Sequence, residues 1–150
     1  QNHYNLIYRE EEREMNPYCA STGVALTPWS PLARGILTGA YKGGFEGGTT
    51  ARSQGGDRKR TEGLYRGEMD FKIAARVGEV AAKLGHTPAQ IAVAWLLSKP
   101  EVTAPVVGVS KISQLEQLVA ATKITLDAED IQYLEELYRP VENLLSLGSS

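Results

Sequence analysis

Residues 25–35, which read ALTPWSPLARG, place a short apolar run directly before an aromatic and polar turn. The run at residues 24–26 predicts a buried strand that ends at a breaker. The two prolines each fix a φ angle and remove a backbone donor, so we expect a stiff turn that presents Trp29 and Ser30. In barrels of alternating strands and helices, ligands bind at this end of the strands. A stacking surface for an aromatic ligand ring and a Trp that fills the barrel rim are both open interpretations.

The composition is that of one globular domain. The chain has 150 residues, of which 42% are hydrophobic and 23% charged, and its net charge of −2 gives no general attraction to nucleic acid. Because Cys19 is the single cysteine, no disulfide can form within the chain, which fits a reducing, cytoplasmic location. No apolar run approaches the roughly 18 residues that span a bilayer, so no membrane partner is expected. The sequence begins at Gln1 inside an apparently structured element, and we expect it to be part of a longer protein.

Predicted strands and helices alternate along the chain, which is typical of an α/β fold. Residues 1–6 look like the end of a strand, with Gln1, His3 and Asn5 on one face. The further expected elements are a helix over 9–19 with a solvated acidic face, ended by Gly23; a helix over 71–84, ended by Gly85; an almost wholly apolar helix over 88–97, capped by Thr87, with Trp95 in the core; an irregular strand over 102–107; and a last helix over 127–138.

Residues 34–68 differ in character from the rest, because they hold ten of the fifteen glycines together with cations such as Arg52, Arg58 and Lys59. A loop of this length is usually a linker or a functional lid. Glycines and cations together suit a flap that closes over phosphates, and a surface excursion with solubilising charge is the alternative. Residues 141–150 are expected to form a weakly structured tail.

A second informative turn covers residues 108–116, which read GVSKISQLE. Ser113 with Glu116 predicts a capping box at a helix start. A strand that leads through Gly108 and Ser110 into a helix N-terminus forms an anion site from free amides and the positive end of the helix dipole. Barrels often hold phosphate in this way after strands 7 and 8. Helix capping without any ligand is the commoner cause of such a pattern.

The remaining residues and motifs indicate no metal site and no further catalytic motif. His3, His86 and Cys19 are isolated and lack the spacing of a metal-ligand set, so no metal is expected. Neither the glycine motif of dinucleotide-binding folds nor a nucleophile elbow occurs.

Taken together, these stretches resemble the C-terminal half of an aldo-keto reductase. The matching text includes QNHYNLIYR at 1–9, WSPLARG at 29–35, TPAQIAVAWLL at 87–97, PVVG at 105–108 and LEELY at 134–138. The resemblance is closest to the branch that holds aldehyde and aryl-alcohol reductases and the potassium-channel β-subunits. It implies an α/β fold, a (β/α)8 TIM barrel that binds NADP(H) across its C-terminal mouth. Residues 1–150 would supply about strands 6–8 and their helices as part of a single barrel domain.

The resemblance also implies a set of cofactor-binding residues, each matched to a position in the family pattern. They are Gln1 for the nicotinamide carboxamide and Trp29 for the nicotinamide face; Ser30, Pro31, Leu32, Ala33 and Arg34 along the pyrophosphate; Arg52 in the closing loop; and Gly108, Ser110, Gln114 and Gln117 for the adenosine 2′-phosphate and adenine.

Two positions depart from the family pattern. Leu118 stands where relatives often place Asn near the adenine, and Ala40 stands where some carry Lys in the flap. Each departure removes a polar contact with the cofactor. Cofactor affinity and the preference for NADP over NAD can therefore differ from those of the family pattern. The family's acid–base Asp, Tyr, Lys and His lie on earlier strands, before the segment that matches Gln1. We therefore assign no catalytic residue to this chain.

Three hypotheses follow from the resemblance. In the first, the chain is the cofactor-binding half of an NADP(H)-dependent reductase that passes hydride to a small aldehyde or ketone, with the N-terminal half of the barrel as its missing partner. In the second, it belongs to a non-catalytic nucleotide-sensing or interaction subunit, like the channel-associated relatives. In the third, it is an inactive truncated product with exposed strand edges. Intact acid–base residues upstream would favour the first hypothesis, and a substituted set would favour the second.

Overall fold

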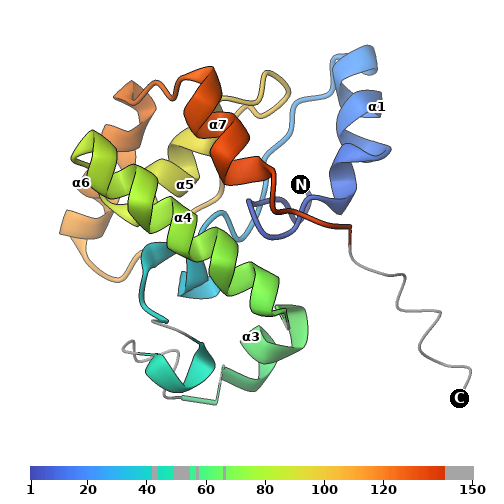
Figure 1. Ribbon diagram of the computed structural model, residues 1–150. Helices are drawn as coiled ribbons and strands as arrows, with labels where there is room; N and C mark the ends of the chain where they lie inside the picture. The colour runs from blue at the N-terminus through green and yellow to red at the C-terminus, as the bar shows by residue number, and fades with distance from the viewer. Residues whose placement is uncertain (42–43, 49–54, 57, 66, 141–150) are drawn as a thin grey trace, which may run out of the picture.

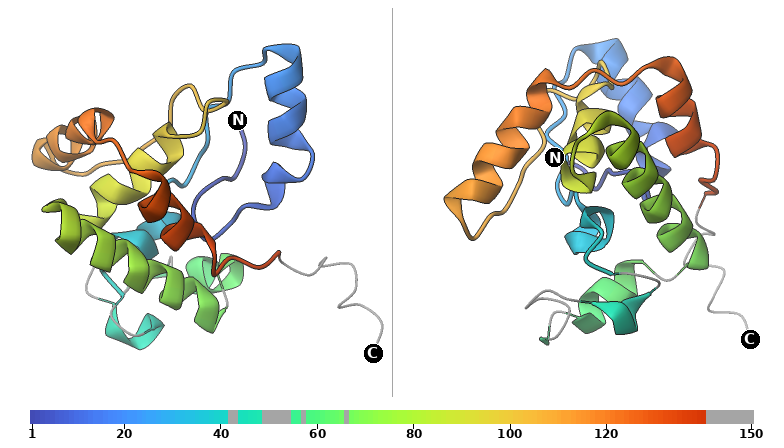
Figure 2. Two further views of the ribbon diagram at one scale, coloured as in Figure 1. Left: turned by 45° about the horizontal axis from the view of Figure 1, so that its top comes forward. Right: turned by 60° about the vertical axis from the view of Figure 1, so that its left-hand side comes forward.

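The structure, a computed structural model, describes residues 1–41, 44–48, 55–56, 58–65 and 67–140. Its centre is formed by α4 (Glu68–Leu84), α5 (Pro88–Leu97) and α7 (Ala128–Glu135), with α5 packed between α4 and α6 (Ile112–Ala120) (Figure 1). Helix α1 (Met15–Thr22) and α6 lie apart, at opposite sides of α5, in the left view of Figure 2. The shorter helices are η1 (Glu10–Glu12), η2 (Ala33–Thr38), η3 (Phe45–Gly47), α3 (Arg58–Leu64) and η4 (Ala121–Lys123).

Single parallel bridges stand where strands were expected. They join His3 to Trp29, Trp29 to Val106 and Leu26 to Val102. The three segments that carry these bridges therefore run side by side in one direction, in their chain order, and the described residues hold no longer strand. The helices together with this parallel order fit an α/β sector of a barrel, but the barrel itself stays a prediction.

The expected strands over 24–26 and 102–107 are wrong in extent. Val24 follows the C-cap of α1, where its amide donates to the Cys19 carbonyl at 3.0 Å, and the residue is 53% exposed. In the later segment Pro105 offers no ladder donor, and pairing is confined to bridges at Val102 and Val106.

The acidic run precedes α1 instead of forming it, so the expected helix over 9–19 is also corrected. Glu12 accepts hydrogen bonds from the Tyr4 hydroxyl at 2.6 Å and from Arg9 at 2.8 Å, and these contacts hold the run in the short helix η1. Gly23, with φ 71°, ends α1 in the left-handed conformation, as predicted.

Helix α5 begins and ends where the sequence predicts, and α4 ends there too, but α4 begins at Glu68, three residues before the expected start at residue 71. Gly85 ends α4 with φ 71°. Thr87 caps α5, because its Oγ1 accepts from the Gln90 amide while the Gln90 side chain accepts from the Thr87 amide at 3.0 Å, and Pro88 takes the first helical position. Trp95 of α5 is fully buried, which confirms its core role.

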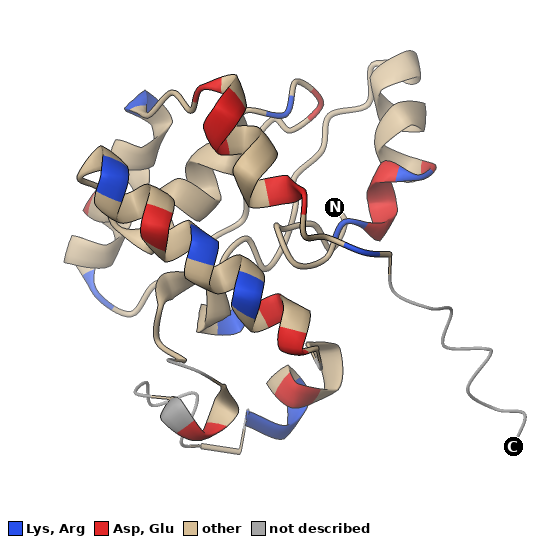
Figure 3. Ribbon diagram, in the orientation of Figure 1, with Lys and Arg blue, Asp and Glu red and all other residues tan. Residues whose placement is uncertain are grey.

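Charged side chains of both signs lie along α4 (Figure 3). Two charged residues of α4 form ion pairs with residues of α7 or at its end. Lys83 pairs with Asp130 at 2.7 Å, and Arg76 pairs with Glu136 at 2.5 Å. Helix α7 starts where the sequence predicts, since the Asp127 carboxylate accepts from the Asp130 amide at 2.7 Å, but it ends at Glu135, three residues earlier than expected.

The segment 34–68, expected to be a flap, contains η3, α3 and most of η2 in its described part. Its residues 42–43, 49–54, 57 and 66, including Arg52, lie outside the described residues, as does the predicted tail at 141–150. Among the described helices, none combines the length and the apolar character that crossing a bilayer requires.

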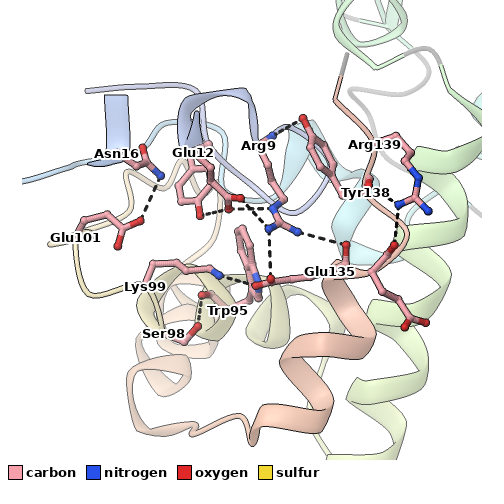
Figure 4. A network of polar contacts seen from close by, with 12 residues as sticks. Arg9, Glu12, Asn16, Trp95, Ser98, Lys99, Glu101, Glu135, Tyr138 and Arg139 are labelled. Atoms are coloured by element: carbon pink, nitrogen blue, oxygen red, sulfur yellow. Dashed lines mark hydrogen bonds and ion pairs between the residues drawn. The ribbon is translucent and has the colours of Figure 1, made fainter. Parts of the chain in front are cut away.

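A polar network ties the N-terminal segment to the ends of α5 and α7 (Figure 4). The Glu135 carboxylate accepts from Trp95 Nε1 at 2.7 Å and from Lys99 Nζ at 2.5 Å, and its second oxygen lies 3.3 Å from Arg9. Burial by itself would raise the pKa of Glu135, but the hydrogen bonds from Lys99 and Trp95 and the charge of Arg9 outweigh it and lower that pKa.

We predict that Glu135→Gln lowers the free energy of unfolding at pH 7 by about 1–3 kcal/mol, because Lys99 and Arg9 lose a charged partner. A carboxylate whose pKa is lowered by folding contributes its stability above the unfolded pKa and loses it as the pH falls through the folded pKa. Urea denaturation should therefore show a weaker acid dependence in the variant. Glu129→Gln, an exposed change on the same helix, is the control, and an equal loss there would contradict the role of the network.

Candidate functional site

The backbone directly after Trp29 is left-handed at three residues that carry a side chain. Ser30, Ala33 and Arg34 have φ of 58°, 46° and 56°, and they are the positive-φ residues other than glycine in the part of the chain that the structure describes. Each such residue costs on the order of 1 kcal/mol, and it persists only where its surroundings impose it. Gly35 follows with φ 102°. We call residues 30–35 the left-handed turn.

Buried polar side chains hold this turn. Asn5 has no exposed surface, and its Nδ2 donates to the Ser30 carbonyl at 2.9 Å while its Oδ1 accepts from the Ile7 amide at 3.0 Å. The Trp29 amide, just before the turn, donates to the Asn2 carbonyl at 2.8 Å. The N-terminal segment therefore fixes where the turn begins.

A stack of rings lies beside the turn. His3 is placed between Tyr8 and Trp29, with ring centroids 4.1 Å from each and interplanar angles of 13° and 14°. Burial lowers the pKa of His3 to about 4, so the imidazole is neutral at neutral pH. Because His3 covers one face of the Trp29 indole, a ligand ring would have to use the opposite face.

The remaining residues that were matched to the pyrophosphate and nicotinamide take different positions. Pro31 and Ala33 are buried, whereas Leu32 and Arg34 are half-buried. Gln1 is exposed and lies two residues before the His3 bridge. The amides of Ala33 and Gly35 already donate to the carbonyls of Ser30 and Leu32 within the turn, so Arg34 is the cationic group that this segment offers to an anion. Ala33 is a packing residue.

A second turn, residues 108–114, lies at the same end of the parallel segments, because the Trp29–Val106 bridge aligns the chains just before both turns. The expected capping box of Ser113 and Glu116 is wrong. Lys111 is the N-cap, and Gln114 Oε1 accepts from the amides of Ser110 at 2.9 Å and Lys111 at 3.3 Å. A side chain at N3 therefore caps the amides that were expected to meet an anion.

The positions farther along α6 serve packing. The Gln117 carbonyl accepts from Gln90 Nε2 at 3.1 Å and joins α6 to α5. Leu118 is 6% exposed and packs in an apolar cluster with Ala89, Val93 and Ala121. The departure at Leu118 therefore has a structural use, since the side chain fills the space beneath α6.

Sequence reasoning missed three residues around the left-handed turn: Asn5, Thr61 and Tyr65. Asn5 gave a partial signal, because it shares a strand face with Gln1 and His3. Thr61 and Tyr65 gave none, because they lie within a glycine-rich segment that carries no hydrophobic period. Only the fold brings them to the turn.

Two shallow depressions lie along α7, one bordered by Arg9, Glu135 and Tyr138 and the other by Lys83 and Asp130. Neither includes the two turns. Within the described ranges, no three His, Cys, Asp or Glu side chains gather as a metal site would require.

The model of the aldo/keto reductase family matches residues 1–139. Similar curated proteins include an aryl-alcohol dehydrogenase of Schizosaccharomyces pombe, 47% identical over 94% of this chain and 38% of its own length. Versiconal hemiacetal acetate reductase of Aspergillus parasiticus is 44% identical over 93% and 40%, and an aldo-keto reductase of Metarhizium robertsii is 44% identical over 93% and 36%. The chain thus spans about two fifths of the length of these relatives.

We predict that the stability of the chain falls as the pH drops from about 6.5 toward 4. The reason is that folding lowers the pKa of His3, so the unfolded chain binds the extra proton in this window. His3→Phe keeps a ring in the stack and should reduce the slope of unfolding free energy against pH, measured by urea denaturation. The exposed His86→Gln is the control, and an unchanged slope in His3→Phe would show that His3 is not the titrating group.

Proposed function

Because the chain belongs to the aldo/keto reductase family, we propose that it supplies the NADP(H)-binding part of an oxidoreductase that reduces small aldehydes or ketones to alcohols. The observation that carries the proposal is the placement of the left-handed turn and the second turn at one end of adjacent parallel segments. Ligands of barrels bind at this end. The relatives named as dehydrogenase and reductase support the same class of chemistry.

The chemistry of the left-handed turn suits the nicotinamide and pyrophosphate. In the proposal, the nicotinamide stacks on the face of Trp29 that lies opposite His3. Arg34 brings a permanent positive charge to the turn, and its guanidinium is held by Thr61. Gln1 would bond the carboxamide, and Arg52 would approach from the closing loop. These roles rest on the family resemblance.

The second turn would hold the adenosine 2′-phosphate. Ser110 and Lys111 are exposed at the start of α6, where the helix dipole favours an anion. Gln114 occupies the neighbouring amides, so its side chain is expected to exchange those contacts for the ligand. Since Leu118 is buried, the preference for NADP over NAD would depend on Ser110 and Lys111.

Reduction of a carbonyl needs a hydride donor and an acid that protonates the developing alkoxide. NADPH would supply the hydride, and this chain would position it and stack its reactive ring. We place the acid in the remainder of the barrel. Large apolar side chains exposed on both outer helices support such a partner, namely Tyr18 on α1 (63% exposed) and Ile112 on α6 (77% exposed).

We predict that the chain binds NADPH and that Trp29→Ala weakens binding at least tenfold, because the stacking face is lost. Trp29→Phe, which keeps an aromatic face, should retain most of the affinity. NADPH fluorescence titration measures both variants, with circular dichroism to verify folding. No binding by the unsubstituted chain, or equal affinity in Trp29→Ala, would contradict the proposed site.

The same titration with an added aromatic aldehyde tests where the acid lies. We expect no NADPH oxidation by the isolated chain. Turnover would mean that a proton donor is present within these 150 residues.

A further inference from the structure

Tyr65, directly after α3, reaches back to the left-handed turn from a distant part of the sequence. Its hydroxyl lies 2.7 Å from His3 Nε2 and 3.4 Å from Ser30 Oγ, and it accepts from Asn5 Nδ2 at 3.1 Å. The residue is 1% exposed, and its ring meets His3 edge to face, with centroids 5.7 Å apart. One buried hydroxyl thus contacts three residues of the site.

A second tie runs from the same region to the other end of the turn. Arg34 Nε donates to Thr61 Oγ1 at 3.1 Å, and Thr61 has no exposed surface. Thr61 and Tyr65 are one helical turn apart, and the Tyr65 amide donates to the Thr61 carbonyl at 3.0 Å. Together they contact Ser30 and Arg34, two of the three strained residues.

The strain explains why these ties matter. A left-handed residue with a side chain relaxes toward the right-handed or extended region unless contacts oppose it. Without the ties, a part of the population would hold Ser30 and Arg34 in other conformations. Apparent affinity falls in proportion to the fraction of molecules that are competent to bind.

We propose that Tyr65, supported by Thr61, is a positioning residue for the nicotinamide and pyrophosphate end of the cofactor. It acts through Ser30, His3 and Arg34, whose conformations it fixes before the ligand arrives. This inference rests on the proposed function, because it assumes that NADP(H) binds at the left-handed turn.

Tyr41 offers a matched comparison within the same segment. It is also buried, at 4% exposed, but its hydroxyl has no hydrogen-bond partner among the described residues. Removing the hydroxyl of Tyr65 removes contacts with the site, whereas removing the hydroxyl of Tyr41 removes a buried hydroxyl without such contacts.

The test compares Tyr65→Phe with Tyr41→Phe in the full chain, using two ligands in calorimetric titrations. NADPH would contact both turns, whereas adenosine 2′,5′-bisphosphate would engage only the second turn. We expect Tyr65→Phe to weaken NADPH binding about three- to tenfold, because the contacts of the hydroxyl with His3, Asn5 and Ser30 are lost, with the bisphosphate affinity unchanged. Tyr41→Phe should leave both affinities unchanged.

A general loss of structure would weaken both ligands in Tyr65→Phe, and that result would overturn the positioning role. Unchanged NADPH affinity in Tyr65→Phe would also overturn it while leaving the proposed function intact. Failure of the unsubstituted chain to bind NADPH would instead contradict the proposed function, and the inference with it. Thr61→Val, which removes the acceptor of Arg34, gives a second check, because its effect and that of Tyr65→Phe should be less than additive if both act on one turn.

Discussion

The left-handed turn after Trp29 depends on the burial of Asn5. This side chain has no exposed surface, and both of its polar atoms are bonded, one to the Ser30 carbonyl and one to the Ile7 amide. A buried amide left without partners would cost about 1–3 kcal/mol, so the N-terminal segment and the turn are fixed together. The stacked rings of Tyr8, His3 and Trp29 lie beside the left-handed turn.

The rest of the fold positions the left-handed turn and the N-terminal segment that holds it. The bridge between Trp29 and Val106 sets the second turn at the same end as the first. Helix α5 carries the core beneath both segments, and the network around Glu135 ties the N-terminal segment to α5 and α7. Specific polar contacts therefore hold the short parallel segments in place, because a single bridge supplies few ladder bonds of its own.

The sequence predicted α5 and the end of α4, but it misplaced the start of α1 and the end of α7, and the cofactor-binding residues stay a prediction. Helix α4 carries a long apolar period that Gly85 ends, and α5 is almost wholly apolar and is capped by Thr87; all of these are local signals. The strands were predicted too long, because proline and the end of α1 interrupt pairing in ways that an apolar run does not reveal. The contacts of Tyr65 with His3 and Asn5 could not be predicted, since they join residues some sixty positions apart in the sequence. The capping by Gln114 was missed because Ser113 offered an equally good local pattern.

We propose that the two turns together form an NADP(H) site. Amide hydrogen exchange of the chain, measured with and without NADPH, tests it most directly, because each turn is followed separately. We expect NADPH to slow exchange at residues 30–35 and at residues 108–114. Slowed exchange confined to α7, or no change at either turn under saturating NADPH, would contradict it.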